Sequence, residues 1–421
     1  MAFISFMLVL GGFDFQEFTF KAIRTAIKPA NVAPAITMLG IIPATGALVL
    51  KYQDELRKHA DEERKNRDEW RSEFAAALER IISGGSAMSR IAGVHTSVDT
   101  SDKHPDYQDE TVQILCEYLR SDHSEDDPVI ESAVLESLQN HYVKDALSSW
   151  SGHRLDLHGA TIRNPFIFDD CRFDETVNLD GATFEQSFHL TNCSFERLTT
   201  MDTAFYQNPL IKESAINESW DVRLPKSLAT DLIMIDTRIN QILILGISHS
   251  LLFLNCIIGS IKSGSGAIGA IRADGGFIGW IETRGGGTID SIEINNGSIG
   301  SIETDDRIGS IKVDNGSITL VKVGSHGTLE LIDFQGTGKV SSIRVCGTIE
   351  ALMMCGGLVD ELKMTGGVIY AFYASANSEI EKLSLLSGRI VLLIKPSNFK
   401  LDTQSQSRVM KTISLAKAIT A

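Results

Sequence analysis

Side chains that could perform chemistry are scattered thinly along this sequence. The six cysteines show no Cys-x-x-Cys spacing, and none has a histidine partner at zinc-ligand spacing. They are Cys116, Cys171, Cys193, Cys256, Cys346 and Cys355. Four of them coincide with or adjoin positions of a repeat that should point inward. We therefore interpret the cysteines as small buried hydrophobic residues in a reducing compartment.

Histidines, carboxylates and glycine-rich motifs give no better candidate. Asp169–Asp170 and Asp305–Asp306 are adjacent pairs, which on an extended chain point to opposite sides and cannot share a proton. Gly264–Gly269 fits the dinucleotide pattern GxGxxG, but no strand, turn and helix accompany it. The histidines His153, His158, His189, His249 and His326 lack ligands at metal spacing. The sequence therefore predicts no enzyme, and no catalytic, cofactor-binding or metal-binding residues.

A ten-residue repeat runs from Cys256 to Lys395, and the rest of the chain is organised around it. Its pattern is Gly-x-Ile-x-x-Ile-x-Val, and successive copies begin 9 to 11 residues apart without intervening sequence. Such a short fixed period indicates a solenoid. Because residues i and i+2 of an extended chain share a face, Gly297 with Ile299 and Ile302 with Thr304 each form one inward-facing side. Two copies then make a four-sided coil of about 20 to 22 residues.

The same spacing occurs earlier with other residue types. Ala160 and Ala182 are 22 residues apart, as are Cys171 and Cys193, so like residues stack once per turn. The expected inward pairs are Leu155/Leu157, Ala160/Ile162, Phe166/Phe168, Cys171/Phe173, Val177/Leu179, Ala182/Phe184, Phe188/Leu190 and Cys193/Phe195.

These residues resemble pentapeptide repeats. The segments Leu157-His-Gly-Ala-Thr-Ile162, Asp170-Cys-Arg-Phe173, Gly181-Ala-Thr-Phe184 and Asn192-Cys-Ser-Phe195 carry the resemblance. It implies a mainly β fold, a right-handed quadrilateral β-helix. Over Cys256–Lys395 the match is degenerate, because Gly and Ile replace the usual Ala and Leu, and a different β-solenoid is the alternative there. Before these repeats lie an apolar stretch within 32–50, a charged segment at 51–82, Arg90-Ile-Ala-Gly-Val94, Val112-Gln-Ile-Leu-Cys-Glu-Tyr-Leu-Arg120 and Trp150. Taken with them, Ile36–Phe195 resembles the membrane-anchored pentapeptide-repeat proteins of actinobacteria.

The first fifty residues have the composition of a membrane segment. Between Lys28 and Lys51 lie 22 uncharged residues, and Val32–Leu50 as a helix would span about 28 Å, enough for a bilayer core. Met1–Phe13 is apolar as well and is either a short span or an interfacial segment. More basic residues follow the span than precede it, so the solenoid is expected to face the cytoplasm.

The predicted order of parts is a membrane anchor at 1–50, a charged helical stalk at 51–82 and a helical cap at 83–150. Pentapeptide-repeat coils follow at 151–195, an irregular loop at 196–232 and the degenerate Gly-Ile solenoid at 233–395. A C-terminal cap helix at 396–421 completes the chain, with a homodimer through this helix as the alternative role.

Charge and shape give two hypotheses for function. The net charge of -15 argues against direct nucleic-acid binding. Residues 151–395 carry 29 Asp and Glu against 20 Lys and Arg. The first hypothesis is a membrane-tethered scaffold that presents a narrow, dry solenoid of about ten coils to a protein partner, whose identity the sequence does not give. The alternative is an acidic mimic of DNA that binds a type II topoisomerase or another DNA-binding protein, as some pentapeptide-repeat proteins do.

Overall fold

A computed structural model describes residues 32–82, 85–121, 128–223, 231–245, 247–264, 266–375, 377–395 and 409–414. For residues 32–49, 247–249 and 410–414 only the backbone is considered. The chain divides into two units, Met1–Glu73 and Phe74–Ala421.

The first unit consists, where it is described, of the greater part of helix α3 (Val32–Ile82). The charged stalk predicted at 51–82 is therefore confirmed as helix. No helix in the described part of the chain is long and apolar enough to cross a membrane. The span expected at Val32–Leu50 stays a prediction, and Met1–Phe13 lies outside the described residues.

The second unit begins with a helical cap, as predicted for 83–150. Its helices are α4 (Ala87–Lys103), the short 3-10 helix η2 (Pro105–Tyr107), α5 (Gln108–Arg120) and α6 (Pro128–Tyr142). Ser86 caps α4, where its hydroxyl oxygen accepts a hydrogen bond from the Ser89 amide at 3.3 Å. Gly93 allows α4 to approach the last turns of α3, because a Cβ there would lie 2.8 Å from the Ala77 carbonyl oxygen.

The first coils of the solenoid have four short sides, as the spacing predicts. They are built from β1 (Leu155–Asp156), β2 (Thr161–Ile162), β3 (Phe166–Asp169), β4 (Arg172–Phe173), β5 (Val177–Asn178), β6 (Thr183–Phe184), β7 (Phe188–Thr191), β8 (Ser194–Met201) and β9 (Ala204–Phe205). Leu155 pairs with Val177, one coil of 22 residues later, in parallel register. Every residue of the predicted inward pairs in this region is buried.

Later coils use two longer strands per turn. The change starts at β8, which pairs with both β4 and β5 and so joins two sides in one bent strand. The strands from β10 on are β10 (Leu210–Lys212), β11 (Ala215–Arg223), β12 (Asp231–Ile235), β13 (Arg238–Ile244), β14 (Ile247–Leu254), β15 (Ile257–Ser263), β16 (Ala267–Asp274), β17 (Phe277–Thr283), β18 (Thr288–Asn295), β19 (Ser298–Thr304), β20 (Arg307–Asp314), β21 (Ser317–Val323), β22 (Thr328–Gln335), β23 (Lys339–Val345), β24 (Thr348–Met354), β25 (Leu358–Met364), β26 (Val368–Ala374), β27 (Glu379–Leu385), β28 (Arg389–Lys395) and β29 (Val409–Ser414).

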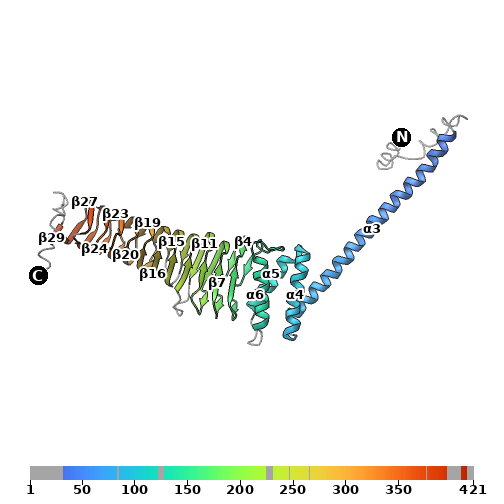
Figure 1. The fold of residues 1–421 in the computed structure, drawn as a ribbon, viewed down its shortest axis with the longest axis horizontal. Coiled ribbons are helices and arrows are strands. Elements are labelled where there is room, and N and C mark those ends of the chain that lie inside the picture. The colour runs from blue at the N-terminus through green and yellow to red at the C-terminus, as the bar shows by residue number, and fades with distance from the viewer. Residues whose placement is uncertain are drawn as a thin grey trace. The chain divides into compact units, whose positions relative to one another are not determined.

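Together with β1, β3, β4, β5, β7 and β8, these strands form two parallel sheets of 13 strands each, which Figure 1 shows in sequence from β4 to β29. The strands β2, β6 and β9 form a third sheet of three strands. The odd-numbered strands from β11 to β27 lie in one sheet and the even-numbered strands from β10 to β28 lie, with β29, in the other. The result is a right-handed β-solenoid of about 11 turns, close to the ten predicted. At about 4.8 Å per stacked strand, it extends about 50 Å.

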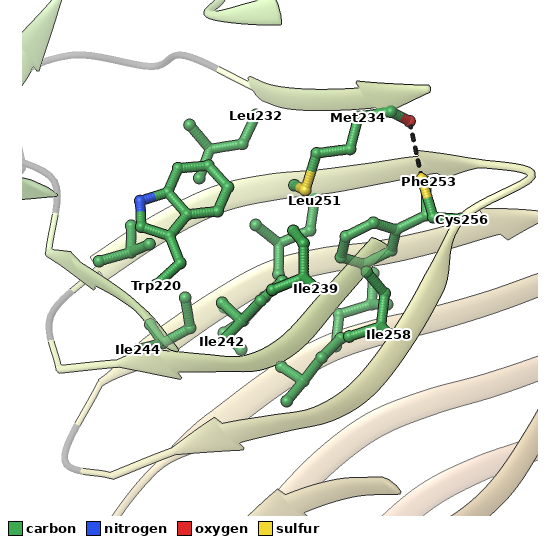
Figure 2. Packing of buried hydrophobic residues seen from close by; sticks show 14 of the residues in the cluster. Trp220, Leu232, Met234, Ile239, Ile242, Ile244, Leu251, Phe253, Cys256 and Ile258 are labelled. Atoms are coloured by element: carbon green, nitrogen blue, oxygen red, sulfur yellow. Dashed lines mark hydrogen bonds between the residues drawn. The ribbon is translucent and has the colours of Figure 1, made fainter. Parts of the chain in front are cut away.

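The interior of the solenoid is filled with stacked apolar side chains (Figure 2). Gly297, Ile299, Ile302 and Thr304 are all buried, so both predicted inward pairs of that copy are confirmed. The bend falls between Ile299 and Ile302, where two consecutive residues point away from the core. Gly297 is required at its corner, because a Cβ there would lie 2.6 Å from the Gly275 carbonyl oxygen of the preceding coil.

The structure corrects two predicted parts of the chain. The irregular loop expected at 196–232 is largely solenoid, since β8 to β12 continue both sheets and only 224–230 lies outside the described residues. The C-terminal helix expected at 396–421 is a strand where it is described, because Val409–Ser414 forms β29 and pairs with β28. The edge of β28 offers this segment a complete row of backbone hydrogen bonds, which an isolated short helix does not match.

Candidate interaction surfaces

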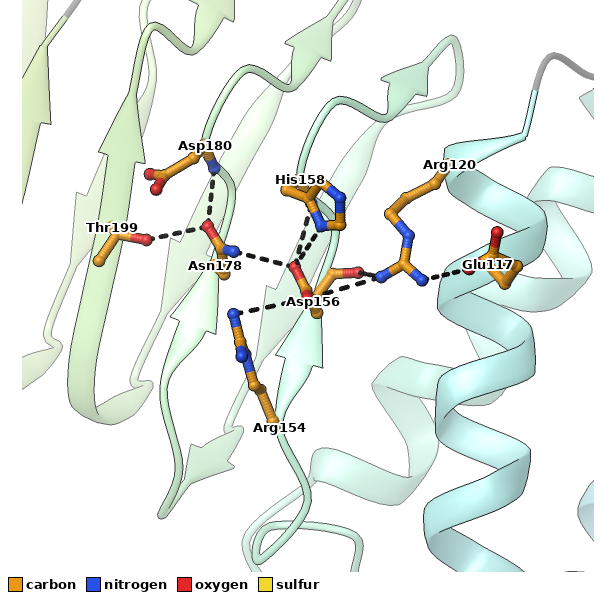
Figure 3. Close-up of polar contacts among 8 residues, drawn as sticks. All are labelled: Glu117, Arg120, Arg154, Asp156, His158, Asn178, Asp180 and Thr199. Carbon is orange, nitrogen blue, oxygen red and sulfur yellow. Dashed lines mark hydrogen bonds and ion pairs between the residues drawn. The ribbon is translucent and has the colours of Figure 1, made fainter.

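A polar network joins the helical cap to the first coil (Figure 3). Arg120 on α5 donates a hydrogen bond to the Asp156 carbonyl oxygen at 2.8 Å and lies 3.6 Å from the Asp156 carboxylate. His158 and Asn178 also donate to that carboxylate, at 2.9 and 3.0 Å. Partial burial works to raise the pKa of Asp156, but the hydrogen bonds from His158 and the positive charge of Arg154 outweigh it and hold the pKa below its usual value.

Helix α6 seals the same end of the solenoid. Glu131, which is fully buried, accepts hydrogen bonds from the backbone amides of Arg163 and Asn164 at 2.9 and 2.7 Å. The Tyr142 ring stacks on Phe173 with 4.7 Å between the ring centres. The cap thus covers apolar and backbone groups that the first coil would otherwise expose.

The cysteines divide into a buried and an exposed group. Cys116, Cys171, Cys193 and Cys256 are buried as expected, whereas Cys346 and Cys355 are exposed, which corrects the prediction for these two. Burial raises the pKa of Cys116 to about 12, which makes this thiol unreactive. Cys256 donates through Sγ to the Met234 carbonyl at 3.3 Å, so it has a structural role (Figure 2).

The other sequence features suited to chemistry stay apart. Across the described ranges, no three histidine, cysteine, aspartate or glutamate side chains gather closely enough to bind a metal ion. His158 and His153 each pair with one carboxylate, Asp156 and Asp109 respectively. The strand β16 begins at Ala267, inside the GxGxxG-like segment, where a dinucleotide site requires a helix, so Gly269 belongs to the solenoid.

The outward side chains align into ladders that run along the solenoid. One ladder, here called outer ladder 1, consists of outward residues in register on successive even-numbered strands. The residues at its two ends are apolar, and those between them are charged. Outer ladder 1 comprises Ile233, Leu252, Arg272, Glu293, Lys312, Asp333, Met353, Tyr373 and Ile394. The four charges alternate in sign, which is the favourable arrangement on neighbouring strands.

The C-terminal end of outer ladder 1 is an apolar patch. Met353, Tyr373 and Ile394 lie on three successive strands of the same sheet. Met353 is 37% exposed, and Tyr370, three residues before Tyr373 on β26, is 51% exposed. We call these four residues the C-terminal apolar patch. Met353, Tyr373 and Ile394 stand side by side in register, whereas Tyr370 lies at the bend of β26. Large apolar side chains that point outward in this way are typical of protein-binding surfaces.

The odd-numbered strands carry a second ladder, which is charged throughout. Outer ladder 2 comprises Lys262, Glu282, Glu303, Lys322, Arg344 and Lys363, each in register with the next. Glu303 pairs with Lys322 of the next strand at 3.0 Å, and Glu282 pairs with Arg284 on its own chain segment.

Many carboxylates on the solenoid surface are neutralised by a cation one coil away. The pairs joining neighbouring coils, in the part of the solenoid that is described, include Arg197–Asp221, Arg223–Asp202, Arg272–Glu293, Arg307–Glu330, Lys322–Glu303, Lys339–Asp360 and Lys382–Glu361. The carboxylates in these pairs are therefore less available to a partner than unpaired carboxylates are.

The sequence contained part of the signal for these ladders. Each ladder residue between Cys256 and Lys395 occupies the position between the second Ile and the Val in alternate copies of the repeat. Because the number of residues per turn varies, the repeat alone does not show which of these positions are neighbours. The register of the strands supplies that information.

Comparisons of the chain with models of known protein families, with curated proteins and with solved structures find no match. The resemblance of Leu155–Phe195 to pentapeptide repeats therefore stays a prediction.

Proposed function

We propose that this protein is a non-enzymatic scaffold whose solenoid binds a protein partner. The observation that carries the proposal is the C-terminal apolar patch, where Met353, Tyr370, Tyr373 and Ile394 point outward from a core that is already filled. Covering such side chains contributes about 1.5–3 kcal/mol for each one fully buried.

Three further parts of the proposal rest on the sequence. Val32–Leu50 holds the protein at a membrane, because no charged residue interrupts this stretch. The solenoid faces the cytoplasm, on the side rich in basic residues. The coils at 151–195 belong to the quadrilateral pentapeptide-repeat type, because small residues and Leu or Phe alternate at their inward positions.

Ion pairing between coils favours the scaffold over the DNA mimic. A mimic must offer unpaired negative charge at regular intervals, and its binding must weaken steeply with salt. In this solenoid Glu293 and Glu330 each lie within 3.1 Å of an arginine from a neighbouring coil. Arg197 and Asp221 form a similar pair at 2.5 Å.

The test is affinity capture with the full chain in detergent, comparing the wild type with Tyr373→Lys and with Lys312→Gln as the matched control from the same ladder. We expect the wild type and Lys312→Gln to capture one partner and Tyr373→Lys to lose it. The partner should stay bound at about 0.5 M salt, a concentration that screens exposed charge pairs. Loss of a type II topoisomerase or another DNA-binding protein at high salt, with no effect of Tyr373→Lys, would show the mimic to be correct.

The tether is tested separately by extracting membranes with alkaline carbonate. A protein held by an apolar span resists this treatment, because burial in the bilayer does not depend on charge. Release into the soluble fraction would contradict the tether and leave the scaffold proposal intact.

A further inference from the structure

Three cations of outer ladder 2 stack on neighbouring strands with no acidic residue between them. Lys322 is in register with Arg344, and Arg344 is in register with Lys363. Neighbouring strands lie about 4.8 Å apart, and like charges directly opposite one another destabilise a sheet. Outer ladder 1 avoids this cost, since Lys312 lies between Glu293 and Asp333.

Two of these three cations have no carboxylate of their own. Lys322 pairs with Glu303 at 3.0 Å, but Arg344 and Lys363 form no ion pair within the described residues. The neighbouring carboxylate, Glu361, is bonded to Lys382 at 3.0 Å. That bond, and then the positive charges of Lys382, Lys363 and Arg344, hold the pKa of Glu361 below its usual value. Arg344 and Lys363 thus create a local positive potential that the protein leaves unpaired.

We propose that Arg344 and Lys363 bind the phosphoryl group of a phosphorylated residue on the protein partner. This inference rests on the proposed function, because it names the chemistry of a partner segment that the scaffold recognises. A phosphate monoester carries nearly two negative charges and so neutralises both cations, whereas one carboxylate neutralises only one of them. The Arg344 guanidinium donates two parallel N–H bonds to phosphate oxygens, and the Lys363 ammonium donates from the next strand.

The charges around the two cations select an isolated dianion over a continuous polyanion. Glu303 and Glu361 flank them, and the whole chain carries a net charge of -15. A nucleic acid or an anionic bilayer would bring many negative charges against these carboxylates. A single phosphoryl group on an otherwise neutral peptide brings only its own two charges near these carboxylates. Arg344 is exposed and Lys363 is half-buried, so a ligand can reach both cations from solvent.

The test measures fluorescence anisotropy of a labelled neutral peptide that contains one phosphoserine, with the full chain in detergent. We expect binding of the phosphopeptide, at least tenfold weaker binding of the unphosphorylated peptide, and competition by inorganic phosphate. Arg344→Gln and Lys363→Gln should each weaken binding about tenfold, and Arg344→Lys should weaken it less. Lys312→Gln, a matched cation on the opposite sheet, should leave it unchanged.

A second measurement does not depend on the peptide. In phosphate-free buffer, Arg344→Gln should raise the melting temperature, because it relieves repulsion from Lys322 and Lys363. Phosphate should stabilise the wild type and not this variant.

Equal binding of the two peptides, or equal loss with Lys312→Gln, would overturn the inference. Tighter binding of single-stranded DNA or of phosphatidylserine vesicles than of the phosphopeptide would also overturn it. Failure here is distinguishable from failure of the scaffold, because capture that depends on Tyr373 would be unaffected by Arg344→Gln.

Discussion

Replacing one inward isoleucine should open the solenoid locally, and Ile302→Ala is the change that shows this most directly. Ile302 is fully buried and stacks between Ile281 of the preceding coil and Val321 of the next. The substitution removes three carbons, worth about 2.4 kcal/mol at about 0.8 kcal/mol each. The cavity adds to this cost, because neighbouring coils hold their positions, and we expect about 3–4 kcal/mol in total.

The matched control is Ser301→Ala, on the same strand and pointing away from the core. The assay is amide hydrogen exchange resolved by mass spectrometry, because a solenoid unfolds by coils and a single unfolding transition would average the effect. A loss of about 3 kcal/mol corresponds to about 100-fold faster exchange in the coils that hold Ile281, Ile302 and Val321. Equal protection in Ile302→Ala and Ser301→Ala would refute the assignment of inward and outward positions.

Three further predictions concern the cap, the ladders and the thiols. Asp156→Asn should weaken the attachment of the cap at pH 7. Since the pKa of Asp156 is lowered in the native protein, its contribution to stability is present above the unfolded pKa of about 3.9 and is lost as the pH falls through the native pKa. The melting temperatures of the variant and the wild type should therefore converge in acid. Lys312→Glu should cost up to about 1 kcal/mol for each neighbour, because it places three carboxylates on adjacent strands, and unchanged stability in urea titrations would contradict the register. Iodoacetamide should label Cys346 and Cys355 in the native protein and spare the four buried cysteines, as peptide mapping would show.

The inward positions were predictable from sequence because repetition makes a weak signal strong. One alternation of apolar residues is ambiguous, but Ile299 and Ile302 recur in the same spacing in copy after copy. The joining of four sides into two bent strands was not predictable in this way. It depends on whether backbone pairing continues around the corner between Ile299 and Ile302, which side-chain type does not report.

The region 196–232 lacks the apolar pattern of the solenoid because polar residues occupy some of its inward positions. Thr203 is fully buried and its hydroxyl donates to the Leu179 carbonyl of the coil below at 2.7 Å. Ser214 likewise donates to the Lys212 carbonyl at 2.8 Å. A hydroxyl that bonds to the backbone fills an inward slot as well as a small apolar residue does, so the period continues where its apolar signal stops.

The C-terminal strand was mistaken for a helix for a different reason. Val409 and Ile413 are four residues apart, which suits one face of a helix, but such a short apolar run suits a strand equally well. The outward ladders were predictable only in part, since their positions in the repeat are fixed but their side-chain types follow no repeat. Which outward residues meet depends on coil lengths, and these vary between 19 residues for Ile299 to Ile318 and 22 for Ile318 to Val340.

The order of the parts along the chain has a consequence for how the protein is made. The helices of the cap are synthesised before any coil, and domains generally fold in the order in which they leave the ribosome. The cap offers the first coil backbone partners at Lys144, whose amide donates to the Asp170 carbonyl at 2.8 Å, and at Glu131. Each later coil contacts mainly the one made just before it. The solenoid can therefore fold during translation, one turn after another, because each newly synthesised segment can pair with the edge strand of a turn that has already folded.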